Sequence, residues 1–338
     1  MNTPDRFDRQ VRFAGLGPEG QRRLGEARVL LVGCGALGGV LAQELARMGV
    51  GLLRLVDRDI VELSNLPRQV LFEERHAESG HPKVEAARET LERIGGPTRI
   101  ETHAVHVGAE NITELAEGVD LVLDGTDNLS TRYLINDLCV SRELPWVYGG
   151  VVGASGLVLG VRPGQGACLR CLFPEPPPAG SLPTCDSAGV ILPAVAAVAS
   201  LQAGIGARLL VDPAGCTSRL QSIDVWEPEV HRLNAPRDPA CPCCGERRFE
   251  FLESVEREPV VLCGRNTVQV NATGPRPDLE RLARHLEPIT DAVERIGAVL
   301  RFGVEEFRVT VFPDGRALIE GTEDPERARI LYDRFLGS

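Results

Sequence analysis

A glycine-rich loop, followed at a fixed distance by an acidic residue, is the first chemical signal in this sequence. Gly33, Gly35 and Gly38 give the pattern G-x-G-x-x-G, with Ala36 inside it, and Asp57 stands 24 residues after Gly33. Glycines let the backbone approach a phosphate closely, and the N-terminus of a following helix favours negative charge. Asp57 would accept hydrogen bonds from ribose hydroxyls. The pattern predicts a nucleotide-binding loop and, taken alone, is typical of a dinucleotide-binding unit.

Further polar residues indicate which nucleotide binds. Arg68 follows the second expected strand, Lys83 opens the next helix, and Asp127 and Asn128 follow a later strand. Each could by itself be an ordinary loop, helix-opening or capping residue. Two cations and a carboxylate around one glycine loop fit a triphosphate with Mg²⁺ better than a nicotinamide cofactor. As a set at one edge of a parallel sheet, they predict a site for ATP and Mg²⁺.

Two pairs of cysteines have the spacing of metal ligands. Cys168 and Cys171 form one C-x-x-C pair, and Cys241 and Cys244 form another, much farther along the chain than in a typical zinc finger. Four thiolates suit a tetrahedral zinc ion, so we expect structural Zn²⁺, with reduced cysteines around an empty site as the alternative. Cys243 lies between two of these ligands and is expected to point away, with C-x-C ligation as the alternative.

Composition narrows the class of protein. Of the 338 residues, 43% are hydrophobic but only 4% are aromatic, which suits an aliphatic core around a parallel sheet. The net charge of −11 argues against nucleic acid or an anionic membrane as the partner. Residues 1–10 lack the apolar stretch of a secretion signal, so a cytoplasmic location is expected, with the ten cysteines in metal or thiol chemistry. The uncharged run 189–207 is expected to be a buried helix and not a membrane span.

Alternating strands and helices would position these groups. Strands are expected at 28–32, 52–56, 99–105, 119–124 and 145–148, and helices at 37–48, 83–94, 111–117 and 130–142. The helical spacing is clear at Leu37, Leu41, Leu45 and Met48. This alternation predicts a Rossmann-like, doubly wound α/β fold with a mainly parallel sheet, whose strand ends carry the nucleotide site.

The pattern changes near the C-terminus. Leu279, Leu282 and Leu286 predict a helix, 307–311 alternates as a strand, and 313–315 signals a hairpin turn. We expect a nucleotide-binding domain at 1–254, which includes the zinc-bound element, and a small α+β domain of unknown role at 255–338. The boundary is placed near 253–258. The proline-rich stretch 173–186 and the region 227–247 are expected to be loops.

Taken together, the motifs resemble the ThiF/MoeB/HesA family, the bacterial relatives of ubiquitin-activating enzymes. The resemblance covers most of the chain, from residue 6 to about residue 245, with the motifs in the family's order. They are Arg6-Phe7-Asp8-Arg9-Gln10, the glycine loop, Asp57-x-Asp59, Ser64-Asn65-Leu66-x-Arg68-Gln69, Lys83-Val84-Glu85, Thr126-Asp127-Asn128, Cys168-x-x-Cys171, Thr184-Cys185 and Cys241-x-x-Cys244-Gly245.

The resemblance implies roles for single residues. Asp57 would hold the ribose, Asn65, Arg68 and Lys83 would contact the phosphates, and Asp127 would bind Mg²⁺. It also implies that Arg9, in an N-terminal segment where no helix or strand is expected, reaches the partner subunit's site in a homodimer. The remaining residues of the implied nucleotide site are Asp59, Ser64 and Asn128, beside the glycine loop.

The implied reaction is adenylylation of the C-terminal glycine carboxylate of a ubiquitin-like sulfur-carrier protein (ThiS/MoaD type) ending in Gly-Gly, with release of pyrophosphate. A cysteine desulfurase or sulfurtransferase would be a further partner. Cys185 matches a cysteine that some thiamine-pathway relatives use covalently, although Asp186 opposes a lowered thiol pKa. Two alternatives stay open: a conjugation enzyme that forms a thioester on Cys185, and an NAD-dependent oxidoreductase. The pathway (thiamine, molybdopterin, tRNA thiolation or conjugation) also stays open.

Overall fold

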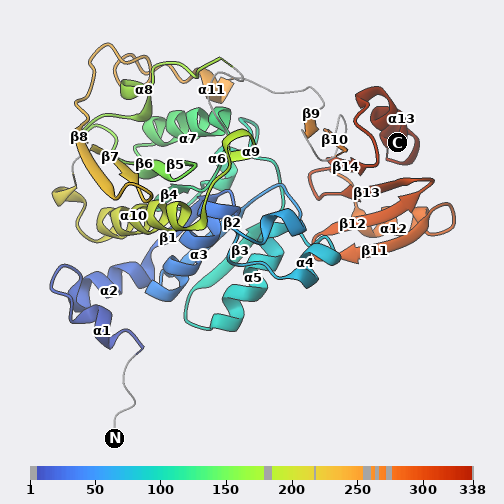
Figure 1. Cartoon of the computed structure of the whole chain (residues 1–338), viewed down its shortest axis with the longest axis horizontal. Coiled ribbons are helices and arrows are strands. Elements are labelled where there is room, and N and C mark those ends of the chain that lie inside the picture. The colour runs from blue at the N-terminus through green and yellow to red at the C-terminus, as the bar shows by residue number, and fades with distance from the viewer. Residues whose placement is uncertain are drawn as a thin grey trace, which may run out of the picture.

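Two sheets organise the protein, one in each of two units (Figure 1). The computed structural model describes residues 6–178, 185–216, 218–253, 260–262, 266–271 and 276–336. The described residues of the N-terminal unit run to residue 253, and those of the C-terminal unit start at residue 260. The expected domain boundary falls mainly on residues 254–259, which lie outside the described residues.

The N-terminal sheet has eight strands in the order β3-β2-β1-β4-β5-β6-β7-β8. The first five pair in parallel, and β6 to β8 continue the sheet in antiparallel pairing. They are β1 (Arg28–Val32), β2 (Leu52–Val56), β3 (Arg99–His103), β4 (Leu121–Asp124), β5 (Trp146–Val152), β6 (Ser155–Val161), β7 (Arg219–Asp224) and β8 (Glu229–Asn234). The central strands β1 and β4 read as near-continuous apolar runs because helices cover both faces of the sheet.

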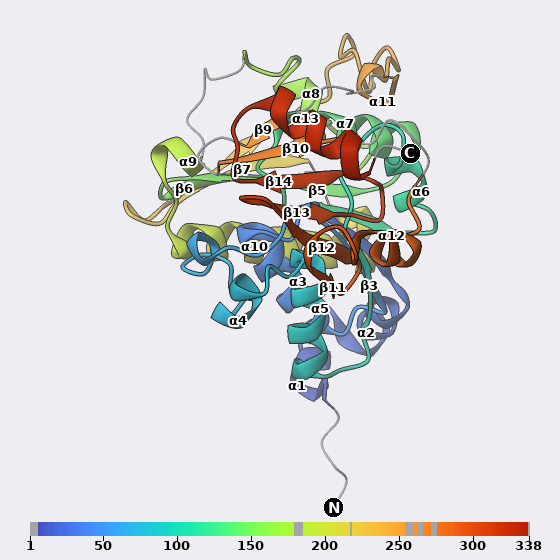
Figure 2. The same ribbon diagram turned by 90° about the vertical axis from the view of Figure 1, so that its right-hand side faces the viewer.

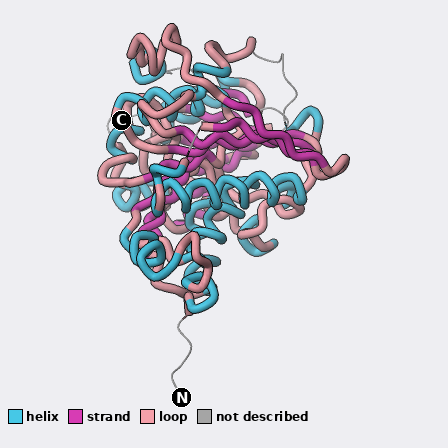
Figure 3. Tube along the Cα trace, turned by 90° about the vertical axis from the view of Figure 1, so that its left-hand side faces the viewer, coloured by secondary structure: helices cyan, strands magenta, loops and turns pink. Residues whose placement is uncertain are grey.

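Helices lie on both sides of these strands, as Figure 3 shows. They are α1 (Asp8–Val11), α2 (Gly17–Glu26), α3 (Ala36–Met48), α4 (Glu74–Glu78), α5 (Lys83–Ile94), α6 (Ile112–Leu115), α7 (Leu129–Ser141), α8 (Leu169–Leu172), α9 (Cys185–Ala188), α10 (Leu192–Val211) and α11 (Glu250–Glu253), with 3-10 turns at Leu63–Asn65 and Pro213–Gly215. The apolar helix α10 is long enough to span a membrane, but half of its most apolar window is buried against α3, β5 and β6. It is therefore a core helix, as predicted.

The C-terminal unit is a six-stranded antiparallel sheet in the order β11-β12-β13-β14-β10-β9, with two helices (Figure 2). Its elements are β9 (Val260–Leu262), β10 (Thr267–Val270), α12 (Leu279–Leu286), β11 (Asp291–Ile296), β12 (Val299–Val304), β13 (Phe307–Val311), β14 (Ala317–Glu320) and α13 (Pro325–Phe335). Successive strand residues face opposite sides. Leu300 and Ile319 accordingly pack with α12 and α13, whereas their neighbours Val299 and Leu318 join the core of the N-terminal unit.

The parallel half of the N-terminal sheet matches the sequence prediction closely, and the predicted helix and strand at 279–286 and 307–311 are present. Three predictions were wrong. The region 227–247 contains strand β8, whose six residues are all exposed and so carry no burial pattern. The stretch 173–186 gives way to helix α9 at Cys185, two residues after its last proline. The N-terminal segment forms the short helix α1 and then α2.

Candidate functional site

A cavity of about 710 Å³ lies at the carboxyl ends of β1, β2 and β4. It is lined by most residues that the sequence singled out for nucleotide binding: Gly33, Gly35, Ala36, Asp57, Asp59, Arg68, Lys83, Asp127 and Asn128. Within the described part of the chain, Gly38, Ser64, Asn65 and Arg9 are not among the lining residues. The fold therefore gathers residues from 33 to 128 at one edge of the sheet.

The glycine loop is packed too tightly for side chains at two positions. Gly33 has a φ of +88°, and a Cβ there would lie 2.7 Å from the carbonyl of Gly125. A Cβ on Gly38 would lie 2.0 Å from the carbonyl oxygen of Gly33. Gly38 thus serves the contact between loop and helix and does not face the cavity. Ala36 begins helix α3, where an alanine Cβ is accommodated.

Asp57 ties the glycine loop to the end of β2. Its Oδ2 accepts a hydrogen bond from the main-chain N–H of Cys34 at 2.7 Å, and its Oδ1 accepts one from the N–H of Asp59 at 2.8 Å. Burial raises the pKa of Asp57, and the nearby Lys83 acts against that rise. Two main-chain donors therefore fix this carboxyl group at the cavity wall, and each oxygen keeps a further lone pair.

Lys83 and Asp59 form a largely buried ion pair beside the cavity. Lys83 Nζ lies 3.0 Å from Asp59 Oδ2, and the Lys83 side chain is only 6% exposed. The main chains are joined as well, because the N–H of Lys83 donates to the carbonyl of Asp59 at 2.9 Å. The pair holds the start of α5 against the loop after β2, which places an ammonium group at the cavity wall.

The 3-10 turn Leu63–Asn65 supports Arg68. The Oδ1 of the buried Asn65 accepts a hydrogen bond from the N–H of Glu62 at 3.2 Å. The carbonyl of Ser64 accepts one from Arg68 Nη1 at 2.7 Å, and Arg68 itself lines the cavity. In this geometry Ser64 and Asn65 shape the loop that carries the arginine.

Asp127 and Asn128 lie between β4 and α7. Asn128 caps α7, because its Oδ1 accepts a hydrogen bond from the N–H of Thr131 at 3.1 Å. Asp127 is exposed and lines the same edge of the cavity. Its carboxylate is accessible to a cation there, while Asn128 fixes the start of the helix.

Arg132 is a lining residue that the sequence prediction missed. Its Nε lies 3.1 Å from Oδ2 of the buried Asp124, and its Nη2 donates to the carbonyl of Gly149 at 3.0 Å. Its guanidinium carbon lies 5.2 Å from the centre of the Tyr148 ring. The sequence signal was a cation close to the start of the helix expected at 130–142.

His106 and Arg58 form a second part of the wall that the sequence prediction missed. Arg58 Nη1 lies 3.3 Å from His106 Nδ1. Because a guanidinium only donates, Nδ1 must accept and the imidazole proton sits on Nε2. Burial, reinforced by Arg58, lowers the pKa of His106 to about 4. The ring is thus a neutral donor. Its sequence signal was its position just after the strand expected at 99–105.

Arg9 lies far from the cavity of its own chain. Its neighbour Gln10 donates from Nε2 to the carbonyl of Met48 at 2.8 Å, and a Cβ on Gly49 would meet the Phe7 ring at 2.4 Å. These contacts place α1 beside the last turn of α3, whereas the glycine loop opens its first turn. Thirteen helical residues separate the two ends by about 18 Å.

The four predicted metal ligands meet in one cluster. The Sγ atoms of Cys168, Cys171, Cys241 and Cys244 all lie within 4.8 Å of one another. The separations of 3.3 Å for Cys171–Cys244 and 3.6 Å for Cys168–Cys241 are close to the distance of about 3.8 Å expected between sulfurs of a tetrahedral zinc site. The residues present fit a tetrahedral metal ion.

Asn136 connects the two cysteine pairs and was not singled out from the sequence. Its Oδ1 accepts a hydrogen bond from the N–H of Leu169 at 2.9 Å, and its Nδ2 lies 3.2 Å from Cys243 Sγ. Cys243 is buried beside the four-sulfur cluster but is not part of it. The sulfur cluster is therefore formed by the first and fourth residues of each C-x-x-C motif, and not by the C-x-C alternative that would use Cys243.

Cys185 opens helix α9 in the segment that crosses above β5. The described residues of this crossover include Pro177 and Pro178, which line the cavity, as does Val190 after the helix. Described residues on both sides of Cys185 in the sequence therefore line the cavity. The position of its thiol lies outside the described side chains.

Comparisons with known proteins identify relatives of this chain by sequence and by fold. The ThiF family model matches residues 7–243. A sulfur carrier protein ThiS adenylyltransferase of Bacillus subtilis (strain 168) is 39% identical over 336 residues, which cover 98% of this chain and 99% of that protein. A sulfur carrier protein adenylyltransferase of Thermus thermophilus is 39% identical over 250 residues, 72% of this chain and 91% of that protein.

A similar fold is found in a crystal structure of E. coli MccB with MccA-N7isoASN, with a TM-score of 0.64 at 23% identity over 72% of this chain and 75% of that chain. At this identity the likeness concerns the fold alone. The family match over most of the chain, and the two relatives at 39% identity, establish the relationship: the chain belongs to the ThiF family.

Proposed function

We propose that this protein is an adenylyltransferase that activates the C-terminal glycine carboxylate of a small ubiquitin-like sulfur-carrier protein with ATP. One observation carries the proposal: a single cavity at the strand ends combines the glycine loop, the two predicted cations Arg68 and Lys83, and three aspartates. The full-length similarity to the Bacillus subtilis ThiS adenylyltransferase supports a ThiS-type carrier as the substrate.

The reaction joins the carrier's carboxylate to the α-phosphorus of ATP. A carboxylate oxygen attacks that phosphorus, the bond to the β-phosphate oxygen breaks, and pyrophosphate leaves. The attacking carboxylate is already ionised at neutral pH, so no general base is required. The protein's part is to hold two anions in line and to offset their charge. Lys83 and Arg68 supply positive charge, and Asp57 accepts from the ribose hydroxyls.

Asp127 is the proposed Mg²⁺ ligand. It is exposed at the cavity edge, and carboxylate oxygen is a ligand that Mg²⁺ prefers. When bound, the ion would offset the charge of the ATP phosphates. Asn128 keeps this carboxylate in place by capping α7.

The enzyme is proposed to act as a homodimer in which Arg9 completes the partner's site. Within one chain Arg9 lies beside the last turn of α3, at the opposite end from the glycine loop. It therefore has no route to its own cavity, which supports a role across a subunit interface. The four-cysteine cluster is proposed to hold a structural Zn²⁺.

The direct test is ATP–pyrophosphate exchange with purified carriers. We expect exchange with a ThiS-type carrier ending in Gly-Gly, and none with the same carrier lacking its last glycine. A panel of carriers from sulfur-transfer and conjugation pathways then identifies the pathway. Absence of exchange with every carrier, at saturating ATP and Mg²⁺, would refute the proposed function.

Cys185 is proposed to act after activation, in covalent sulfur transfer. Cys185→Ala should then keep pyrophosphate exchange close to the wild-type rate but fail in a coupled assay that forms carrier thiocarboxylate with a cysteine desulfurase. A stable enzyme–carrier thioester, trapped on wild type and absent from Cys185→Ala, would instead favour the conjugation alternative. Loss of exchange in the variant would place Cys185 within the adenylation site.

A further inference from the structure

The C-terminal unit docks against the loops that build the nucleotide cavity. Two of its arginines cross the interface, Arg316 from the turn between β13 and β14, and Arg301 from β12. Both are buried, with 2% and 8% of their surface exposed. The carbonyl groups that accept hydrogen bonds from these two guanidinium groups show which loops the C-terminal unit holds in place.

Arg316 binds the loop after β2. Its Nη2 donates to the carbonyl of Arg58 at 2.7 Å, and its guanidinium carbon lies 3.5 Å from the centre of the Phe312 ring. From the same turn, Asp314 Oδ2 accepts a hydrogen bond from the N–H of His106 at 3.2 Å. Arg58 and His106 both line the cavity. The turn between β13 and β14 thus contacts the cavity wall directly through these two hydrogen bonds.

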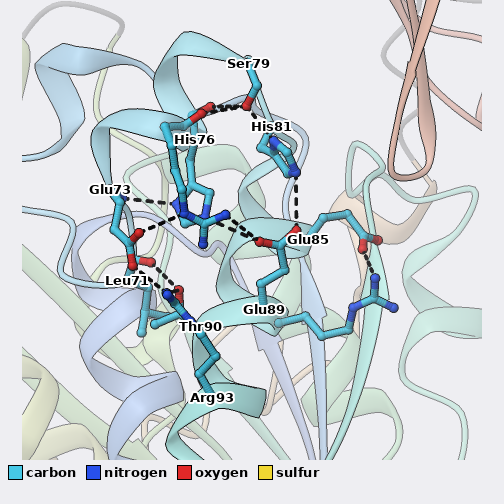
Figure 4. Close-up of polar contacts among 11 residues, drawn as sticks. Leu71, Glu73, His76, Ser79, His81, Glu85, Glu89, Thr90 and Arg93 are labelled. Atoms are coloured by element: carbon cyan, nitrogen blue, oxygen red, sulfur yellow. Dashed lines mark hydrogen bonds and ion pairs between the residues drawn. The ribbon is translucent and has the colours of Figure 1, made fainter.

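Arg301 binds the loop that leads into α5. Its Nη1 donates to the carbonyl of Ser79 at 2.7 Å, and its Nη2 donates to that of Gly80 at 3.1 Å. A Cβ on Gly80 would lie 1.8 Å from Nη2, so the arginine occupies the space that a side chain would need. Figure 4 shows the same segment held from within, since Ser79 Oγ and Glu89 Oε1 contact the two nitrogens of His81 at 2.6 and 3.3 Å.

The loop after β2 and the loop that leads into α5 are hydrogen-bonded to each other. The N–H of Val61 donates to the carbonyl of His81 at 2.8 Å, and Lys83 and Asp59 are joined through both main chain and side chain. One loop supplies Asp59 and the other supplies Lys83. Arg316 therefore anchors one arm of the Lys83–Asp59 pair, and Arg301 anchors the other.

We propose that Arg301 and Arg316 are positioning residues of the nucleotide site, and that the docked C-terminal unit is a structural part of that site. The two arginines fix the carbonyls of residues 58, 79 and 80, and so set where Lys83 and the Arg58–His106 wall stand against the nucleotide. Positioning of this kind acts strongly on rates and affinities, since a misplacement of about 1 Å can cost on the order of 100-fold. The inference rests on the proposed function in that ATP occupies the cavity.

The kinetic test compares Arg316→Ala and Arg301→Ala with Arg308→Ala, a control on an exposed arginine of the same sheet that pairs with Glu320. ATP–pyrophosphate exchange is measured against ATP concentration at saturating carrier. We expect the KM for ATP to rise about tenfold or more in the two test variants. Arg316→Lys keeps the positive charge and N–H donors but loses the planar guanidinium, so its KM should fall between wild type and Arg316→Ala. Arg308→Ala should match wild type.

Two outcomes would overturn the inference. One is a wild-type KM and kcat in both alanine variants. The other is a kcat lowered in proportion to the folded fraction, with KM unchanged, because a merely structural role removes active molecules without altering those that remain. If the alanine variants fold poorly, KM and kcat are measured instead for Arg316→Lys and Arg301→Lys, and the same two outcomes would overturn the inference.

A second measurement needs no activity. In nucleotide-free protein, amide hydrogen exchange at residues 58–61 and 79–83 should be faster in Arg316→Ala than in Arg308→Ala, whereas exchange in β1 and β4 should be unchanged. Equal amide hydrogen exchange in the two variants would contradict the proposal that Arg316 holds this loop in place. If the wild-type protein shows no pyrophosphate exchange, only the proposed function is refuted. The hydrogen-exchange result would still test whether Arg316 holds the loop in place.

Discussion

The nucleotide cavity and the cysteine cluster are both sets of polar side chains, but they differ in burial and in how the chain assembles them. The cavity is open, and the residues predicted to bind the nucleotide follow neighbouring parallel strands between residues 33 and 128. The cluster is largely buried, and its two halves come from distant parts of the sequence, at 168–171 and 241–244. From this difference we expect substitutions of exposed cavity residues to act mainly on the chemistry, and substitutions in the cluster to act mainly on folding.

The largest expected effect is on the catalytic side of this comparison. Asp127→Ala should lower adenylate formation by roughly 1000-fold, about 4 kcal/mol in the barrier, because the proposed Mg²⁺ ligand is lost. The protein should keep its metal content and its Tm, since Asp127 is exposed. Pyrophosphate exchange and thermal melting measure the two properties, with the exposed Asp291→Ala as a control. Near-normal exchange in Asp127→Ala would remove this residue from the mechanism.

The cysteine cluster should respond in the opposite way. Purified wild type should contain one zinc per chain, and Cys171→Ser should lose it and melt about 10 °C lower, as expected when a buried metal site worth a few kcal/mol is broken. Activity per folded molecule should be retained. Elemental analysis and calorimetry provide the measurements. Cys216→Ser, a half-buried cysteine outside the cluster, is the control and should keep its zinc.

Metal-free wild-type protein gives a further test of whether the cysteine cluster stabilises the fold. If carefully prepared protein holds no zinc and melts as the metal-containing protein does, the four cysteines are bystanders. The contrast between the two regions would then rest on the cavity alone.

A mixing experiment tests whether the cavity is complete within one chain. Arg9→Ala and Asp127→Ala should each be inactive, but a heterodimer of the two would hold one intact site, made of Asp127 from one subunit and Arg9 from the other. Mixed under conditions that exchange subunits, they should recover up to half of the wild-type activity per heterodimer. If subunit exchange is confirmed by mass and no activity returns, Arg9 does not act across the interface.

The smallest expected effect is a pH dependence of stability from the cavity wall. The pKa of His106 is lowered to about 4, below the ordinary value near 6.5, so the unfolded chain binds more protons between these two values. Stability should therefore fall as pH drops from about 6.5 towards 4, by on the order of 2–3 kcal/mol from this residue. His106→Asn should flatten that part of the profile measured by denaturant unfolding. The exposed His231→Asn should leave it unchanged, and an equal slope in wild type and His106→Asn would contradict the assignment.

Much of the fold was predictable because local patterns coincide with tertiary layers. Strands 28–32 and 52–56 and helix 83–94 have the predicted bounds, since β1 and β2 are buried on both faces and α5 is amphipathic. The antiparallel strands β6, β7 and β8 were missed. Residues of β7 are at most partly buried and those of β8 are all exposed. These two strands therefore lack the alternation of polar and apolar residues that predicts a strand.

The sequence by itself determined the glycine loop, the spacing of the cysteines and the residues of the cavity that follow strands. These depend on local sterics and on short-range order: Gly33 needs a positive φ, and parallel strands end at a common edge. Only the tertiary structure decided that Arg132, Arg58 and His106 complete the wall. It also decided that Arg301 and Arg316, which lie far along the chain from the carbonyls they bind, hold that wall in place. Such contacts form only when two surfaces that are distant in the sequence meet, and no local sequence pattern specifies which surfaces pack together.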